Sequence, residues 1–152
     1  MYYQVIAQCT QRLKNLETCL DKADRRLVMS TPVSNFLADL RDYVKAGAAR
    51  LSGQTPPRHE DNEQTIDELR ARIRKTIAFA ESVKEAQYAH ASESKVKLSW
   101  APGKVIGGED YLLQMTIPNT FFHIAMAYAI LRHNIVDVGK MDFLGSINLV
   151  DA

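Results

Sequence analysis

Two side chains capable of chemistry, Asn119 and His123, stand four residues apart in the most apolar stretch of the sequence. Residues with this spacing lie on the same face of an α-helix, one turn above the other. Because Phe122 and Ile124 flank His123, this face is expected to point into the protein. A buried histidine either hydrogen-bonds a neighbouring carboxylate or carbonyl, or binds a metal. A metal site takes about three or four ligands, so this segment alone favours the first interpretation.

Carboxylates that could complete a site lie in residues 32–51. Asp39 and Asp42 stand three apart there. Exposure to solvent is the ordinary interpretation of such a pair. The alternative is that one of the two carboxylates faces inward, toward His123.

A second polar pair, Tyr128 and Arg132, is also spaced four apart. Together with Asp142, these side chains either line the mouth of a pocket or hold the C-terminal residues in place, and the second alternative is favoured. The residues from 137 onward are expected to lie on the rest of the protein through Met141, Phe143, Leu144 and Ile147.

Four stretches with apolar residues at steps of three and four are expected to form the helices that position these side chains. Thr31 and Pro32 can begin the second stretch, and a capping-box pattern at residues 65–68 precedes the third. The small residues 46–49 of the second stretch predict close approach of another helix, in particular the last one. The four stretches cover roughly residues 2–27, 32–51, 65–83 and 108–133.

The apolar pattern between the third and the last stretch is not helical. Residues 95–106 read as two short strands around a tight turn, which predicts a hairpin packed on the helices through Trp100. Pro118 lies inside the last helical stretch. Proline removes a backbone donor and clashes with the carbonyl four residues back, so a kink is predicted near residues 115–117. The expected architecture is an all-α bundle of four helices with a β-hairpin before the last, proline-kinked helix.

Composition indicates one globular domain spanning residues 1–152. The chain is 46% hydrophobic, and 19 basic residues against 18 acidic ones give a net charge of +1. No basic stripe is interleaved with aromatic residues, so no nucleic-acid partner is expected. No apolar run approaches the roughly 18 residues of a membrane span. No signal-peptide pattern is present at the N-terminus, so the cytoplasm is the expected location.

The two cysteines, Cys9 and Cys19, fall in the first helical stretch. Ten helical residues rise about 15 Å, whereas a disulfide needs Cα atoms within about 7 Å, so the two cannot bridge within that helix. Both are expected to be reduced, with Cys9 in the core and Cys19 partly exposed.

With this layout, the sequence resembles the DinB/YfiT-like superfamily of four-helix bundles, and within it an uncharacterised bacterial family. The resemblance covers essentially the whole chain and is most specific in the C-terminal third. The matching residues there are Gly108-Glu109-Asp110-Tyr111-Leu112, Pro118-Asn119, Phe122-His123, residues 127–134 and residues 139–145.

The resemblance implies a metal site that this sequence only partly retains. Many members of the superfamily bind zinc or nickel through three histidines, two on the fourth helix and one on the second, and some are thiol-dependent transferases. His123 matches the second histidine of the fourth helix, and Asn119 replaces the first. The second helix contains no histidine, and Asp39 or Asp42 is its nearest candidate ligand. Asparagine is a poor zinc ligand, so the three-histidine site is expected to be lost and no cofactor is expected.

The sequence therefore predicts an uncharacterised DinB-like bundle that forms a homodimer, as superfamily members often do. The apolar last helix favours a dimer, but the pattern does not show which helices form the interface. One alternative is a metal-dependent hydrolase or thiol transferase that holds zinc or nickel with His123 and Asp42. Another is a bundle that binds an unknown small molecule. The candidate pocket residues for that ligand are Asn119, His123, Tyr128 and Arg132.

Overall fold

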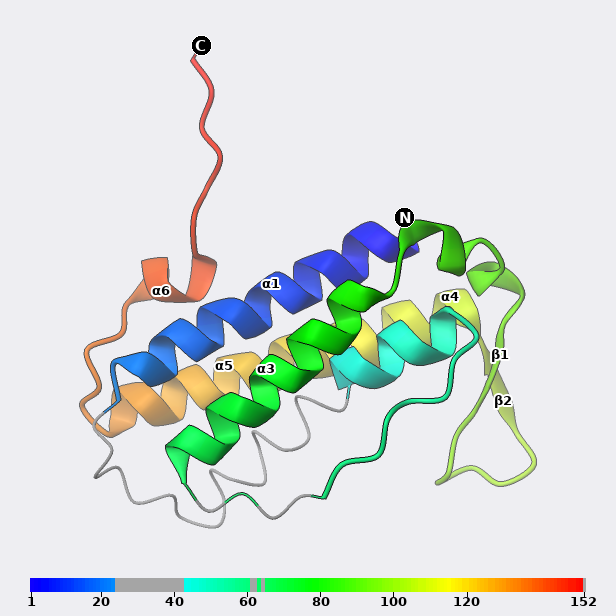
Figure 1. Ribbon diagram of the computed structural model, residues 1–152, viewed down its shortest axis with the longest axis horizontal. Helices are drawn as coiled ribbons and strands as arrows, with labels where there is room; N and C mark the ends of the chain where they lie inside the picture. The colour runs from blue at the N-terminus through cyan, green and yellow to red at the C-terminus, as the bar shows by residue number, and fades with distance from the viewer. Residues whose placement is uncertain (24–42, 61–62, 64, 152) are drawn as a thin grey trace.

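The fold is a bundle of helices with a small antiparallel hairpin at one end (Figure 1), which confirms the predicted fold class. The structure is a computed structural model, and it describes residues 1–23, 43–60, 63 and 65–151. Residues 43–51 form a helical segment. The other described elements are α1 (Tyr2–Asp21), α3 (Ile66–Ser82), η1 (Glu85–Tyr88), η2 (Ala91–Glu93), β1 (Lys95–Lys97), β2 (Val105–Gly107), α4 (Gly108–Asp110), η3 (Tyr111–Thr116), α5 (Ile117–His133) and α6 (Lys140–Leu144).

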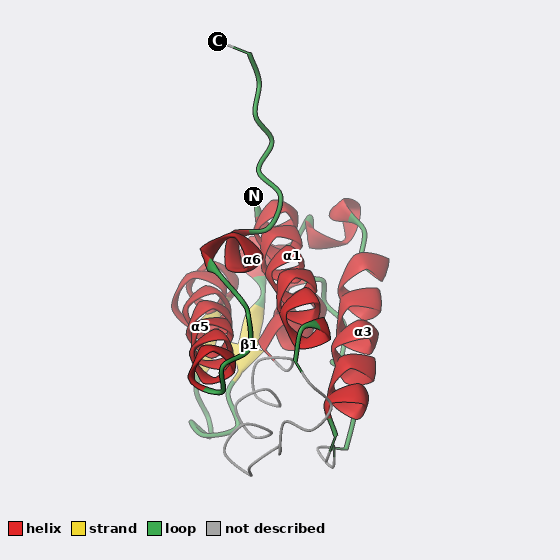
Figure 2. Ribbon diagram, turned by 90° about the vertical axis from the view of Figure 1, so that its left-hand side faces the viewer, coloured by secondary structure: helices red, strands yellow, loops and turns green. Residues whose placement is uncertain are grey.

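Helix α1 lies between α3 and α5 and contributes to the core on both sides (Figure 2). Its buried residues include Ile6, Leu13 and Leu20, and they pack with apolar side chains of α3 and α5. The capping box predicted at Thr65 is present at the start of α3, where Thr65 and Glu68 satisfy each other's backbone donors.

Cys19 differs from its expected exposure. The side chain is only 2% exposed, and burial raises the pKa of its thiol to about 11. The sequence pattern marks a single apolar stripe on the first helix, whereas α1 contacts α3, α5 and α6. Three neighbours cover a wider arc of the helix than one stripe does, so a residue off the stripe becomes buried as well.

The last helix contains a π-helical turn in the place of the predicted kink. Element η3 runs from Tyr111 to Thr116 and continues directly into α5, with Pro118 at the start of that helix. The proline has no N–H and its ring crowds the preceding turn, which gives a physical reason for the wider turn upstream. The Nδ2 of Asn119 donates to the carbonyl of Met115 at 2.7 Å, so a side chain satisfies one backbone group in this region.

The hairpin lies where the sequence predicts it, but a different residue packs it on the helices. Strands β1 and β2 are antiparallel, with Val96 opposite Ile106. Val96 is buried, whereas Trp100 lies beyond the end of β1 and is 70% exposed. The prediction that Trp100 packs the hairpin onto the bundle is therefore wrong. Gly108, just after β2, lies against the backbone of Ala91, and a Cβ at this glycine would be 1.8 Å from the Ala91 carbonyl oxygen.

The C-terminal residues pack on the bundle only in part. Phe143 lies against Tyr128, and Asn15 donates to the Phe143 carbonyl at 3.1 Å. Met141 and Ile147 are exposed, contrary to expectation, and the chain beyond α6 runs away from the bundle (Figure 1). In the described part of the chain, no helix is long and apolar enough to cross a membrane.

Candidate functional site

His123 is buried among aromatic rings on the inner face of α5. Its side chain is 6% exposed. The imidazole stacks on Tyr43, with ring centroids 5.5 Å apart and an angle of 19° between the planes, and it meets Phe122 edge-on at 5.2 Å. Tyr43 belongs to the helical segment 43–51, so His123 faces this segment. The spacing predicted an inward-facing side chain, without naming the helix that it meets.

The described residues do not fit the three-histidine metal site that the family resemblance implies. Within them, no three His, Cys, Asp or Glu side chains come together to hold an ion. The segment 43–51 contains no His, Cys, Asp or Glu. The side chain of this segment that contacts His123 is Tyr43. Asn119 directs its amide nitrogen to a backbone carbonyl. The other candidate ligands, Asp39 and Asp42, lie outside the described residues. No chemical step is therefore derived through a metal.

Tyr128 and Arg132 contact the segment that follows α5. Arg132 donates from Nη1 to the carbonyl of Val138 at 2.8 Å. The Tyr128 ring meets the Phe143 ring edge-on, with centroids 5.7 Å apart. These contacts match the alternative in which the pair holds the C-terminal residues.

Asp142 belongs to a separate contact at the same end of the bundle. Its carboxylate pairs with Lys22 at 2.8 Å and accepts a hydrogen bond from the backbone N–H of Gly139 at 2.7 Å. Both interactions favour the charged carboxylate and so lower the pKa of Asp142. The hydrogen bond with Lys22 has the larger effect and the one with Gly139 the smaller.

The four predicted ligand-binding residues thus fall into two groups. Asn119 and His123 lie near the start and middle of α5, while Tyr128 and Arg132 contact the chain after its end. None of the four lines the pocket that the structure shows beside the hairpin.

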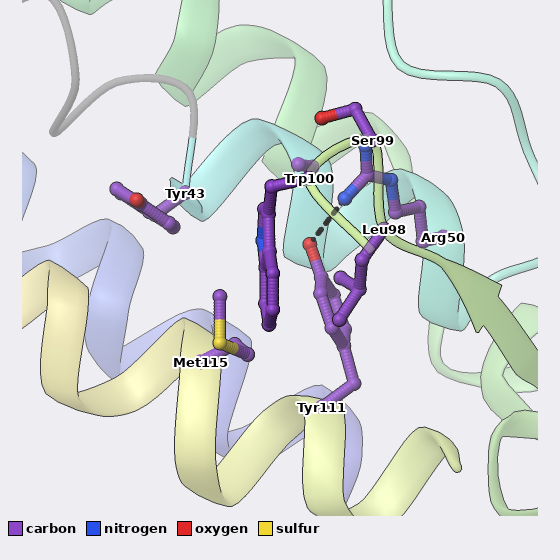
Figure 3. Close-up of a pocket in the computed structure, with 8 residues that line it drawn as sticks. Tyr43, Arg50, Leu98, Ser99, Trp100, Tyr111 and Met115 are labelled. Carbon is purple, nitrogen blue, oxygen red and sulfur yellow. Dashed lines mark hydrogen bonds between the residues drawn. The ribbon is translucent and has the colours of Figure 1, made fainter. Parts of the chain in front are cut away.

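That pocket has a volume of about 290 Å³ and lies where three parts of the chain meet (Figure 3). The helical segment 43–51, the loop after β1 and the π-helical turn η3 each contribute to its wall. The lining residues are Tyr43, Ala46, Arg50, Leu98, Ser99, Trp100, Tyr111 and Met115. The wall therefore combines aromatic and apolar side chains with the polar groups of Arg50, Ser99 and the tyrosines, and both kinds of group are used in small-molecule sites.

Arg50 and Tyr111 form the polar part of this pocket. Nη1 of Arg50 donates to the Tyr111 hydroxyl at 2.9 Å, and the guanidinium carbon lies 5.6 Å from the centre of the Tyr111 ring. Tyr111 is 2% exposed, and burial raises the pKa of its hydroxyl more than Arg50 lowers it. The phenol is therefore neutral at physiological pH and can both accept and donate a hydrogen bond.

Trp100 is the most exposed aromatic residue among those that line the pocket, with 70% of its surface accessible. In Figure 3 its indole is seen edge-on, with Tyr43 on one side and the Arg50–Tyr111 pair on the other. Met115 lies near the foot of the indole. An exposed indole beside a half-buried guanidinium is a surface on which a planar molecule can stack.

Sequence reasoning missed this pocket. Its polar pair joins residues 61 positions apart, and no spacing rule connects them. The available signal was the only tryptophan of the chain, placed at the end of an alternating stretch. That position predicts a packing role in the hairpin and gives no indication of a pocket.

Comparison with known proteins agrees with the fold. The chain superposes with a TM-score of 0.88 on the crystal structure of a DinB family member from Shewanella denitrificans. The two sequences are 34% identical over 99% of this chain and 95% of the other. The fold and this similarity define a DinB-like helical bundle. Within that class, the chain belongs to the family described as a domain of unknown function, DUF1993, whose model matches residues 1–144. No curated protein matches the sequence.

Proposed function

We propose that this DinB-like bundle binds a small organic molecule in the pocket beside the hairpin, formed by Tyr43, Arg50, Trp100, Tyr111 and their neighbours. The observation that carries the proposal is the exposure of Trp100 next to a guanidinium that is held in place by a buried tyrosine. Burying apolar surface contributes about 25 cal/mol per Å², so a planar ligand that covers the indole gains free energy from that contact.

The proposed binding needs no metal cofactor. The lining side chains supply a cation, a hydroxyl group and aromatic faces, which are the groups that orient a small organic ligand. The alternative of a hydrolase or thiol transferase requires a set of ligands for zinc or nickel, and the donors among the described residues do not supply one.

A screen of planar compounds with one or two rings, read by saturation-transfer NMR, tests this proposal. Compounds that bind the wild-type protein are expected to lose their signal with Trp100→Ala. Tyr3→Ala is the matched control, because it also removes an exposed aromatic side chain but lies on α1 and does not line the pocket. Hits that keep their signal with Trp100→Ala, or a screen without hits, would contradict the proposal.

We also propose that two copies associate through the outer face of α5. Pro118, Phe121, Phe122, Ala125 and Ala129 are exposed there, and helical spacing places them on one face. No Asp, Glu, Lys or Arg occurs from 117 to 131. A partner surface must therefore be uncharged, and a second α5 in a two-fold arrangement supplies one, with phenylalanines packed over the small alanines.

Light scattering after gel filtration tests the association. The expected mass is about twice the 17.1 kDa of one chain, and Ala125→Arg, which places a charge in the centre of this face, should return the mass to that of a monomer. A monomeric wild-type protein at about 50 μM would contradict the proposal, since a stable dimer has a Kd well below that concentration.

A further inference from the structure

No carboxylate among the described residues neutralises the positive charge of Arg50. The side chain is half-buried in the wall of the pocket. It forms no salt bridge with any carboxylate in the part of the chain that the structure describes. Its contacts are the hydrogen bond to the hydroxyl of Tyr111 and the position over the Tyr111 ring. Other arginines of the described residues either pair with a carboxylate, as Arg70 does with Asp21 and Arg74 with Glu17, or donate to backbone carbonyls, as Arg132 does.

The surroundings of Arg50 suit an anion. Arg50 is the one charged side chain among the described residues that line the pocket. A guanidinium has five N–H donors, and one of them is directed to Tyr111. Partial burial of a cation without a counter-ion costs free energy. An anion that binds next to Arg50 would neutralise this charge and reduce that cost.

The geometry points to a planar carboxylic acid as the ligand class. We infer that its carboxylate pairs with the free edge of the Arg50 guanidinium while its ring or conjugated body stacks on Trp100. This inference rests on the proposed function, because it concerns the ligand of the same pocket.

The charge of the pocket favours a carboxylate over a phosphate. The guanidinium fork can pair with two oxygens of either group, but one arginine supplies a single charge, which a carboxylate matches, whereas a phosphate carries up to two. The Tyr111 hydroxyl accepts from Arg50 and keeps its own hydrogen, which can be donated to a carboxylate oxygen. The volume of about 290 Å³ suits a molecule with one or two rings.

Two probes of nearly equal shape test the inference. They are 2-naphthoate, which is an anion, and 2-naphthamide, which is neutral. Isothermal titration calorimetry measures both affinities, and the indole N–H resonance of Trp100, the only tryptophan, reports whether binding occurs in the pocket. The wild-type protein should bind 2-naphthoate about tenfold or more tightly, since a charge-assisted pair discriminates on this scale.

Variants at two arginines localise the effect. Arg50→Gln should bind both probes equally, and Arg50→Lys, which keeps the charge but lacks the fork, should show a reduced preference for 2-naphthoate. Arg58→Gln is the matched control, because Arg58 is exposed and does not line the pocket. It should keep the wild-type preference.

The outcomes separate the inference from the proposed function. If the wild-type protein binds both probes with equal affinity and the Trp100 resonance shifts, the carboxylate inference is overturned while the pocket proposal stands. A preference for 2-naphthoate that persists in Arg50→Gln also overturns the inference. If neither probe binds, or if binding leaves the Trp100 resonance unchanged, the pocket proposal fails and the inference fails with it. The wild-type comparison remains decisive even if Arg50→Gln does not fold.

Discussion

Replacing Gly47 by alanine should destabilise this protein, although the same change in most helices stabilises them. Gly47 lies in the helical segment 43–51, where alanine has the higher helix propensity by about 1 kcal/mol. A Cβ at this position, however, would be 2.6 Å from Cγ2 of Thr116 and 3.2 Å from Cδ1 of Ile6. Both neighbours are buried and cannot move aside freely. Overpacking of this kind costs about 1–3 kcal/mol, so the expected net loss of stability is about 1 kcal/mol.

Urea denaturation followed by far-ultraviolet circular dichroism measures the effect. Ala78→Gly, at an exposed position of α3, is the control that gives the propensity difference in this protein, expected at about 1 kcal/mol. Thr116→Ala removes the atoms that the new methyl group meets. The Thr116 hydroxyl has no hydrogen-bond partner among the described residues, so its loss leaves none of them unpaired.

A double-mutant cycle decides the interpretation. The variant with both Gly47→Ala and Thr116→Ala should be more stable than Gly47→Ala alone, with a coupling energy of about 1 kcal/mol or more. A Gly47→Ala protein that is more stable than the wild type would refute the close approach of the second helix to η3. Additive effects in the cycle would show that the loss arises elsewhere.

Three further predictions concern buried groups. Cys9 and Cys19 are both buried and both have a raised thiol pKa. Ellman's reagent should therefore react slowly with the native protein and rapidly in denaturant. Fast labelling of either thiol in the native state would be inconsistent with its burial. Tyr88 has its pKa raised from 10.0 to about 12 by burial, so its contribution to stability is complete below pH 10 and is lost as the pH rises through 12. Tyr88→Phe should therefore lose less stability than the wild type over that range of pH, and an equal loss in both proteins would count against this. The variant should also be at least as stable at pH 7, because the Tyr88 hydroxyl has no hydrogen-bond partner among the described residues. Gly108→Ala should prevent folding or cost several kcal/mol, since its Cβ would overlap the carbonyl oxygen of Ala91, and a thermal melt at the wild-type temperature would rule out that contact.

Much of the fold follows from periodicity and local signals. Within the described residues, the helical stretches, the capping box at Thr65 and the hairpin lie where the sequence predicts them, except that α1 ends at Asp21 and not near residue 27. The predicted start of the second helix at Thr31 and Pro32 lies outside the described residues. The small residues 46–49 predict a close contact with the last helix, and Gly47 does lie against Thr116. Each of these features depends on residues that are neighbours in sequence or share one face of a helix.

The pocket could not be predicted in the same way. Arg50 and Tyr111 come from different elements and meet only after the bundle has formed. The alternating pattern through residue 100 indicates a strand, but the pairing with β2 ends at Lys97. Trp100 therefore lies outside the paired strands, where it is exposed and lines the pocket. The family resemblance singles out Asn119 and His123 as site residues, and neither of them lines the pocket.

The central claim is that a planar organic molecule binds beside Trp100, and the indole N–H resonance of this single tryptophan tests it most directly. In a titration of ¹⁵N-labelled protein with 2-naphthoate, the account predicts a saturable shift of that resonance, together with the backbone resonances of Ser99, Tyr111 and Met115, which line the same pocket. An indole resonance that stays in place at saturating 2-naphthoate, or shifts confined to residues outside the pocket, would contradict the account.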